Sequence, residues 1–187
     1  MTTRITLISN GATVATRNAT FPRDEPLEEK ALALAASLAD ALPAVDRVYC
    51  GPDLAGRQTA AALGLTAESE PQLREINFGR WAGKSLEALQ GDDALALGAW
   101  VTDPQATPPA GDSVTDLITR IGGWLDQQAE RADRLIAIAP ANCLRAAVIH
   151  CLQAPAMAFR RIDVAPLSFI FLSAHHNKWR LRLDPRK

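Results

Sequence analysis

The sequence has almost no excess charge of either sign, since 20 Lys and Arg residues oppose 21 Asp and Glu residues and give a formal net charge of −1. This balance provides no global attraction toward nucleic acid or an anionic membrane surface, so we expect neither partner. Long hydrophobic runs are also missing, because no stretch approaches the ~20 apolar residues that a transmembrane helix needs. Three cysteines are few and odd in number, which argues against the disulfide scaffold of a small secreted protein.

The remaining composition is that of an ordinary globular protein. Hydrophobic residues make up 48% and charged residues 22% of the 187 residues, which is enough apolar surface to offset the entropy lost on folding. This length predicts one domain that spans residues 1–187. The N-terminal segment turns polar after Ile5–Ile8 and does not predict a signal peptide, so we expect a cytoplasmic protein.

Short strands alternate with helices along the chain. Apolar, β-branched runs predict strands at 5–8, 45–50 and 135–139, and a terminal hairpin of 167–173 and 179–183 around His175–Lys178. Helical spacing and stop residues predict helices at 24–42, 54–63, 84–90, 92–101, 113–131 and 142–153. Asp24 and Asn142 are the expected N-caps of the first and last helix. The alternation implies an α/β protein, a three-layer α/β/α sandwich with a mainly parallel central sheet.

Ligands of such a sheet bind beyond the carboxyl ends of its strands. Three ends are predicted here: Ser9-Asn10-Gly11, Cys50-Gly51-Pro52 and Ala139-Pro140-Ala141-Asn142. They offer amides, a hydroxyl and a thiol, but neither a general base nor a fixed cation. Cys143 begins a predicted helix, whose positive end can lower the pKa of a thiol, so a thiol-dependent site is one alternative to a buried, unreactive cysteine.

Histidines are also scarce, and none follows the first or third strand. His150 shares a helix with Cys143 and Cys151, but side chains at this spacing do not converge, so we expect no metal site there. His175 and His176 fall in the predicted turn of the hairpin, where exposure is the simplest interpretation. Trp100 and Trp124 lie on apolar helix faces and are predicted to be core residues.

Six segments follow one another in a recognisable order. They are Ser9–Thr13, Asp24–Leu27, Cys50–Ala60, Leu73–Gly83, Pro109–Ser113 and Ala139–Arg145. The fourth, Leu-Arg-Glu-Ile-Asn-Phe-Gly-Arg-Trp-Ala-Gly, is the most specific, because its composition is hard to obtain by chance. Together the segments resemble the histidine phosphatase superfamily, also called the phosphoglycerate mutase-like family. The resemblance covers nearly the whole chain and implies the phosphoglycerate mutase-like form of the α/β sandwich, with Trp81 packed beneath the pocket rim.

The resemblance also implies where catalytic groups would stand. The family's nucleophilic histidine corresponds to Asn10 and its second histidine to Pro140, while its two phosphate-clamping arginines correspond to Ser9 and Ala55. An amide nitrogen is delocalised and is not a useful nucleophile, and phosphoryl transfer depends on positioning and charge stabilisation. Glu75 is retained at the position of the family's general-acid carboxylate. We therefore expect no catalytic residue at the four substituted positions.

These substitutions predict a catalytically degenerate member, a pseudophosphatase that binds a small ligand or a partner protein at the former phosphate pocket. The candidate ligand-binding residues are Asn10, Gly11, Arg57, Glu75 and Asn142. We expect no cofactor and no metal. A cation could also reach the pocket from Arg17, Arg23 or Arg80, but none of them would supply a nucleophile.

Two other functions stay open. The chain could be an enzyme with a rearranged site, either a phosphomonoester hydrolase or mutase or a thiol-dependent enzyme, or it could be a structural subunit. Self-association is common in the family, so a homo-oligomer is a further expectation, although no segment marks an interface. Two local alternatives also remain: Asn10-Gly11 as a turn whose glycine has positive φ, and Glu75 as a carboxylate that only holds loop amides.

Overall fold

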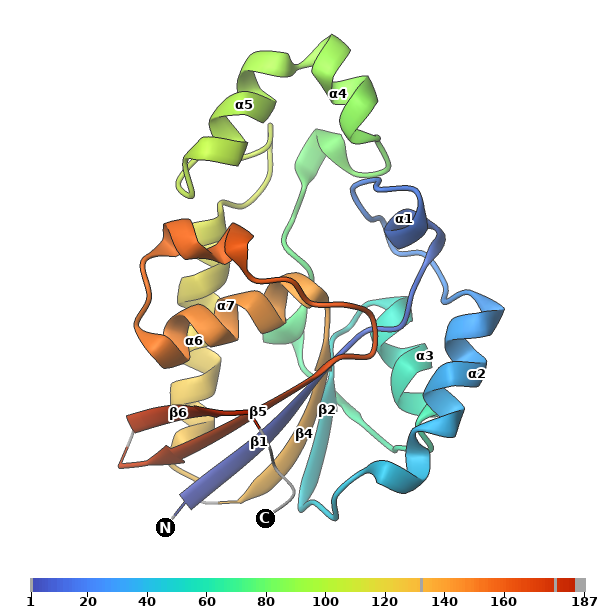
Figure 1. The fold of residues 1–187 in the computed structure, drawn as a ribbon, viewed down its shortest axis with the longest axis vertical. Coiled ribbons are helices and arrows are strands. Elements are labelled where there is room, and N and C mark those ends of the chain that lie inside the picture. Colours follow the sequence, from blue (N-terminus) through green and yellow to red (C-terminus); the bar gives the residue numbers. More distant parts are fainter. Residues whose placement is uncertain (1, 132, 177, 184–187) are drawn as a thin grey trace.

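A six-stranded sheet in the order β3-β2-β4-β1-β5-β6 forms the centre of the computed structural model, which describes residues 2–131, 133–176 and 178–183 (Figure 1). The strands are β1 (Thr2–Ser9), β2 (Arg47–Cys50), β3 (Glu68–Ser69), β4 (Arg134–Ala139), β5 (Phe169–His175) and β6 (Lys178–Arg182). Pairing is parallel from β3 to β1 and antiparallel from β1 to β6. The predicted mainly parallel sheet is therefore confirmed. Asn177 of the predicted hairpin turn lies outside the described residues, as do positions 1 and 184–187 of the predicted domain range.

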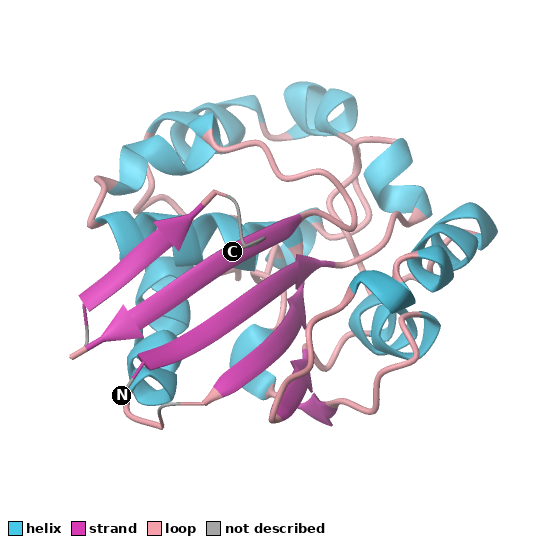
Figure 2. Cartoon of the chain, turned by 60° about the horizontal axis from the view of Figure 1, so that its bottom comes forward, coloured by secondary structure: helices cyan, strands magenta, loops and turns pink. Residues whose placement is uncertain are grey.

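Helices cover the sheet on both faces, as the predicted sandwich requires. They are α1 (Val14–Arg17), α2 (Glu29–Ser37), α3 (Leu54–Ala62), α4 (Leu86–Asp92), α5 (Ala94–Thr102), α6 (Val114–Ala129) and α7 (Ala141–Leu152), with 3-10 turns η1 (Ala39–Ala41), η2 (Pro71–Leu73), η3 (Gly79–Trp81) and η4 (Ala156–Arg161). The pair α6 and α7 packs on one face, and α3 with α2 beside it packs on the other, over β2 and β4 (Figures 1 and 2). In the described part of the chain, no helix is both long and apolar enough to cross a membrane.

The main core lies between the sheet and α6. Ser113 accepts a hydrogen bond from the backbone N–H of Asp116, whose side chain in turn accepts one from the backbone N–H of Ser113, so a capping box starts the helix. From there the apolar stripe of Leu117, Ile121 and Trp124 is at most 2% exposed. The tight burial of this stripe fixes the position of the helix against the strands. Trp124 is thus a core residue, as predicted.

A group of aromatic side chains supports the 78–83 segment. The rings of Phe21, Phe78, Trp81 and Trp100 meet with centroids 4.9–6.2 Å apart, mostly edge to face. Trp81 is 1% exposed, and its indole N–H donates to Asp93 at 2.8 Å. The cluster joins the 78–83 segment to α5 and to the loop before α2, and its members Trp81 and Trp100 are buried as predicted.

Both predicted N-caps are wrong, and each for the same physical reason. The first long helix begins only at Glu29, and Asp24 instead accepts a hydrogen bond from the backbone N–H of Leu54, at the start of α3. Asn142 lies inside α7, whose N-cap is Pro140, and its side chain contacts Glu75. In both cases a polar side chain at a predicted helix end makes a long-range hydrogen bond rather than a local one.

We predict that Gly79→Ala destabilises the protein by more than about 2 kcal/mol, because the glycine has a φ of +52° and an added Cβ would lie 2.1 Å from the carbonyl oxygen of Pro109. Gly98→Ala is the matched control: it lies within α5 with open space around it, and should gain about 0.5–1 kcal/mol. Urea unfolding of both variants measures the two changes. Equal stabilities for the two variants would contradict this account of the 78–83 segment.

Candidate functional site

A cavity of about 140 Å³ opens at the carboxyl ends of β1, β2 and β4, where the sheet topology places a ligand site. Its walls come from the loop after β1, the 22–25 segment, the start of α3, Glu75, the start of α7 and the 164–166 loop. The lining residues are Asn10, Gly11, Thr13, Thr16, Pro22, Arg23, Asp24, Glu25, Asp53, Ala55, Glu75, Pro140, Ala141, Val164 and Pro166. Three of the four positions at which the resemblance implies a substitution, Asn10, Ala55 and Pro140, therefore face this cavity.

The fourth substituted position, Ser9, does not line it. The hydroxyl of Ser9 donates to the carbonyl of Ala165 at 2.7 Å and accepts from the backbone N–H of Ser168 at 2.9 Å. The residue is 1% exposed, so its polar group is fully engaged with the 165–168 loop. Ser9 therefore has a structural role, and it leaves no group at this position to contact a ligand.

Asn10 and Asp53 form the central polar contact of the cavity. The Asn10 side-chain N–H donates to Oδ2 of Asp53 at 2.7 Å, and the same oxygen accepts from the backbone N–H of Gly56 at 2.9 Å as the N-cap of α3. Burial raises the pKa of Asp53, while these hydrogen bonds oppose the shift. Oδ1 of Asn10 and Oδ1 of Asp53 are buried without a hydrogen-bond partner among the described residues.

Glu75 lines the same cavity and titrates near neutrality. Its Oε1 accepts from the backbone N–H of Ile76 at 2.8 Å and from the side chain of Asn142 at 3.1 Å. Burial raises the pKa of Glu75 to about 7, with a smaller contribution from the charge of Asp53, and the two hydrogen bonds act in the opposite direction. The carboxyl group thus changes charge within the physiological range.

Asn142 and Arg57, both predicted to bind a ligand, do not line the cavity. Asn142 is held between Glu75 and Arg145, whose guanidinium donates to the Asn142 oxygen at 2.9 Å, so it orients the carboxylate from behind. Arg57 lies on α3, is exposed, and donates to the carbonyl of Pro52 in the loop before that helix. Of the predicted ligand-binding residues, the structure brings together Asn10, Gly11 and Glu75.

Among the arginines considered as alternative cations, Arg23 is the one that reaches the cavity wall in the part of the chain described here. Its guanidinium donates to the carbonyl of Ala82 at 3.2 Å, and its backbone N–H donates to the Glu25 carboxylate at 2.9 Å. Arg17 instead pairs with Glu28 at 3.1 Å. Asp24, Glu25, Asp53 and Glu75 also line the cavity, so acidic groups outnumber the single lining arginine.

Gly11 is favoured by close packing rather than by backbone conformation. It is absent from the described glycines with positive φ, so the predicted turn with a glycine of positive φ is wrong. An added Cβ would instead lie 3.2 Å from Leu27 and 3.3 Å from Ala31, because the chain passes directly against the start of α2. Its backbone N–H donates to the Thr59 hydroxyl at 3.0 Å. Gly11 therefore lets the loop after β1 lie close to α2 and α3.

The thiol of Cys143 is not activated by its place at the start of α7. The side chain is 2% exposed and donates to the carbonyl of Arg74 at 3.1 Å. Burial raises the pKa of this thiol well above its usual value, and the nearby Glu75 charge acts in the same direction. Desolvation outweighs the effect of the helix end, which is the opposite of the shift a thiolate site needs.

The three histidines of the chain lie away from the cavity. The ring of His150 contacts the Asp126 carboxylate at 2.9 Å, which also accepts from the Trp179 indole at 3.0 Å. His175 and His176 are exposed, as expected. In the residues that the structure describes, no group of three His, Cys, Asp or Glu side chains is arranged to hold a metal ion.

Sequence reasoning missed Asp53, the residue that contacts Asn10. Its position after Gly51-Pro52 and before a helix is the signature of an N-cap, and this signal was available in the sequence. Sequence patterns could not predict that Asp24 and Glu25 line the cavity. Only the tertiary contact of the loop that carries them with α3 brings these two residues there.

We predict that Glu75→Gln stabilises the protein at pH 8 by about 1–3 kcal/mol and has little effect at pH 5. A carboxyl group whose pKa is raised by folding binds more protons in the folded state than in the unfolded state. The free energy of unfolding of the wild type therefore falls as the pH rises from the unfolded pKa of Glu75 to about 7. Glutamine keeps the acceptor oxygen for Ile76 and Asn142 without the charge. Urea unfolding at both pH values tests this, and an equal gain at pH 5 and pH 8 would refute ionisation as its cause.

Solved structures of phosphatases share this fold. A putative alpha-ribazole-5'-P phosphatase from Escherichia coli superposes with a TM-score of 0.88 at 22% identity, covering 96% of this chain and 94% of that chain. A mycobacterial glucosyl-3-phosphoglycerate phosphatase gives 0.83 at 21% identity, covering 96% of each chain. A phosphoserine phosphatase mutant from Entamoeba histolytica gives 0.86 at 16% identity, covering 96% and 94%. At these identities the likeness establishes the fold.

Sequence comparison gives the family itself. No match to the chain is found among curated protein sequences. The family model described as histidine phosphatase superfamily (branch 1) matches residues 5–184, which is nearly the whole chain and includes all six segments noted above. The chain that builds this cavity therefore belongs to the histidine phosphatase superfamily, in its branch 1.

Proposed function

We propose that this protein is a pseudophosphatase, a non-catalytic member of its family that uses the former phosphate pocket to bind a small cationic or hydroxylated ligand. The observation that carries the proposal is the Asn10–Asp53 hydrogen bond of 2.7 Å at the end of β1. An amide whose N–H is donated to a carboxylate occupies the place of the family's nucleophile. Its nitrogen lone pair is delocalised into the carbonyl and cannot attack phosphorus.

The groups that would stabilise a transferring phosphoryl group are also missing from the cavity. Ala55 and Pro140 line it without a side-chain donor, and Ser9 is turned into the 165–168 loop. Phosphoryl transfer depends almost wholly on positioning and on charge stabilisation of this kind. Arg23 is the lining guanidinium, and the Glu25 carboxylate on the same loop accepts its backbone N–H.

The charge of the cavity supports a different class of ligand. Glu75 and Asp53 face it together, and a phosphate dianion would be repelled by their carboxylates. An ammonium group or a hydroxyl could donate to them, and the lining hydroxyls of Thr13 and Thr16 add further polar partners. The cavity is small, at about 140 Å³, which suits a compact amine or polyol or one side chain of a partner protein.

A pseudophosphatase should show no phosphatase turnover. The purified protein is expected to hydrolyse neither an aryl phosphate nor a panel of phosphosugars and phosphoglycerates above the level of Glu75→Gln, because it has no nucleophile or phosphate clamp. Released inorganic phosphate is the measurement. Turnover that Glu75→Gln abolishes would instead support the second candidate, a phosphomonoester hydrolase with a rearranged site, which the near-neutral pKa of Glu75 favours as a general acid.

An acidic cavity should select its ligands by charge. Calorimetric titration should detect binding of small diamines, amino alcohols or aminosugars but not of inorganic phosphate or vanadate. Binding of the amines should strengthen by about tenfold or more between pH 5.5 and pH 8, as Glu75 ionises with its pKa of about 7.

The matched control for this titration is Glu68→Gln, which removes a carboxylate that is exposed on β3 and lies outside the cavity. Glu68→Gln should keep the pH dependence, and Glu75→Gln should lose it. If phosphate binds more tightly than every amine of the panel, the assignment of a cationic ligand is wrong.

A further inference from the structure

One face of the sheet is left partly open by the helices. On the side opposite α6 and α7, α2 and α3 lie over β2 and β4, and Figure 2 shows β5, β6 and the first half of β1 with no helix in front of them. Successive side chains of a strand point to opposite faces. Leu172 and Ala174 are buried on the side of α6 and α7, so Phe171 and Ser173 of the same strand point to the opposite, open side.

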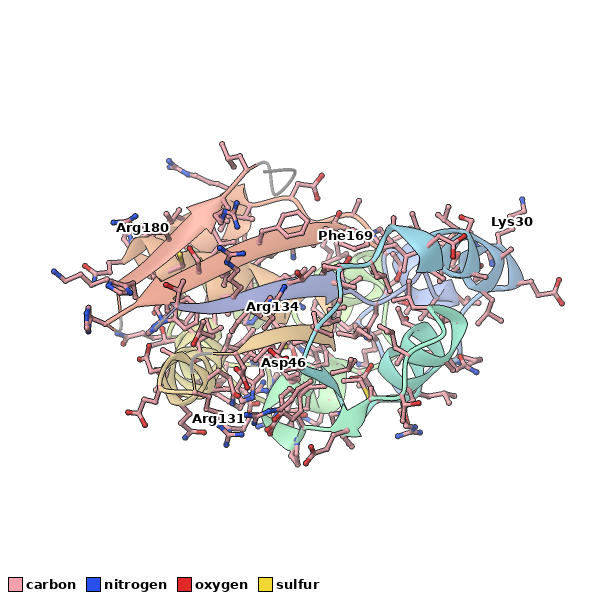
Figure 3. All side chains as sticks on the ribbon, turned by 90° about the horizontal axis from the view of Figure 1, so that it is seen from below. Lys30, Asp46, Arg131, Arg134, Phe169 and Arg180 are labelled. Carbon is pink, nitrogen blue, oxygen red and sulfur yellow. The ribbon has the colours of Figure 1, made fainter. Side chains whose placement is uncertain are left out.

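Arginines gather on this open face because of strand register. Arg134 pairs with Arg4, Arg4 with Ser173, and Ser173 with Arg180, so the four side chains form one row across β4, β1, β5 and β6. All three arginines of the row are exposed, and Figure 3 labels Arg134 and Arg180 on these strands. Two acidic residues, Asp46 and Asp133, share a hollow with Arg4 and Arg134. The Asp46 carboxylate accepts from the backbone N–H of Arg134 at 2.9 Å, and Asp133 pairs with Arg47 at 2.6 Å.

The adjacent rows extend the cationic surface. Arg182 pairs with Phe171 in the next row, and Lys178 pairs with His175 in the preceding one, on the same face. Rows of this kind are about 7 Å apart, because each is two residues along a strand. A chain with a net charge of −1 thus concentrates four arginines and a lysine on one side of its sheet.

Aromatic rings lie among these cations. Phe169 and Phe171 are half-buried neighbours on the open face of β5, with ring centroids 6.2 Å apart and planes at 22°. Phe171 also lines a hollow of about 170 Å³ together with Arg4, Arg134 and Arg182, closed on one side by the 43–45 loop. A flat apolar ring beside several guanidinium groups can contact an aromatic base and its phosphates at the same time.

We propose that this open sheet face binds single-stranded nucleic acid, with Arg4, Arg134 and Arg180 on the phosphates and Phe171 stacked against a base. The site is separate from the cavity at the strand ends and is independent of the proposed function. The balanced composition predicted no such partner, because the arginines are scattered along the chain and only strand pairing brings them together.

The same observations count against other anionic partners. An acidic peptide would pair with the arginines but would have no use for the stacked phenylalanines. A membrane surface requires several large apolar side chains beside the basic ones. Leu34 and Leu95 lie on α2 and α5, so among the described leucines that are strongly exposed, Leu183 at the end of β6 is a single residue next to this face. Base stacking on aromatic rings within a basic surface is the recurring mode for single strands.

The test is fluorescence anisotropy of the full chain with a labelled 12-nucleotide single strand of uridines at 50 mM salt. Three arginines on phosphates predict a slope of about −2 for log K against log salt concentration. The double variant Arg4→Glu/Arg180→Glu should bind at least about tenfold more weakly and reduce that slope to about −0.7, the value for one remaining contact. Circular dichroism confirms that each variant is folded.

The matched control carries the same change of charge elsewhere. Lys30 lies on α2, at the far end of the molecule in Figure 3, and Arg161 is exposed at the end of η4. Lys30→Glu/Arg161→Glu should lower affinity by less than about twofold, since neither residue is on the open face. Equal losses for the two double variants would show a non-specific charge effect and would overturn the proposal.

The role of the ring is tested by Phe171→Leu, which keeps an apolar side chain without a π face. Stacking predicts about fivefold weaker binding or more. If this variant binds like the wild type, no base stacks on Phe171 and the proposal is wrong. If a polyglutamate peptide of equal length competes as well as the oligonucleotide, the face takes an acidic protein instead and the proposal is equally wrong. Absence of measurable binding at 50 mM salt would overturn it as well.

Discussion

Parallel pairing of β1, β2 and β4 is the constraint on which the rest of the site depends. Register fixes Ser9 beside Ala139, so the three chain segments that leave these strands must start at one edge of the sheet. Polar side chains at that edge are partly withdrawn from water and have to find partners there. The Asn10–Asp53 and Asn142–Glu75 hydrogen bonds are the result, and both connect residues more than 40 positions apart.

The same constraint explains the acidic character of the cavity. In this chain the end of β1 supplies an amide, and α3 begins with an acidic cap that faces it. Two carboxyl groups then share one small cavity. Burial raises the pKa of both, with a smaller contribution from the charge of Asp24 at Asp53 and from that of Asp53 at Glu75. Such an arrangement is compatible with a neutral or cationic guest and opposes an anionic one.

Predictions from the sequence were correct where the local sequence pattern and the tertiary packing favour the same structure. Apolar periodicity located α6, and motif order located the whole fold and the cavity residues Asn10 and Glu75. The predictions failed where a polar side chain has two possible partners. Asp24 and Asn142 look like N-caps locally, yet each satisfies a distant group, and sequence periodicity carries no information about that choice.

The open face of the sheet shows the limit of composition as a guide to partners. Net charge averages over the whole surface, whereas binding depends on the field at one patch. The strand order places β1 between β4 and β5, and therefore aligns Arg4 with residues 130 and about 170 positions later in the chain. No scan along the sequence reveals this alignment, because it requires both the topology and the register. A near-neutral chain can thus carry a strongly basic surface when its cations occupy one row of a sheet.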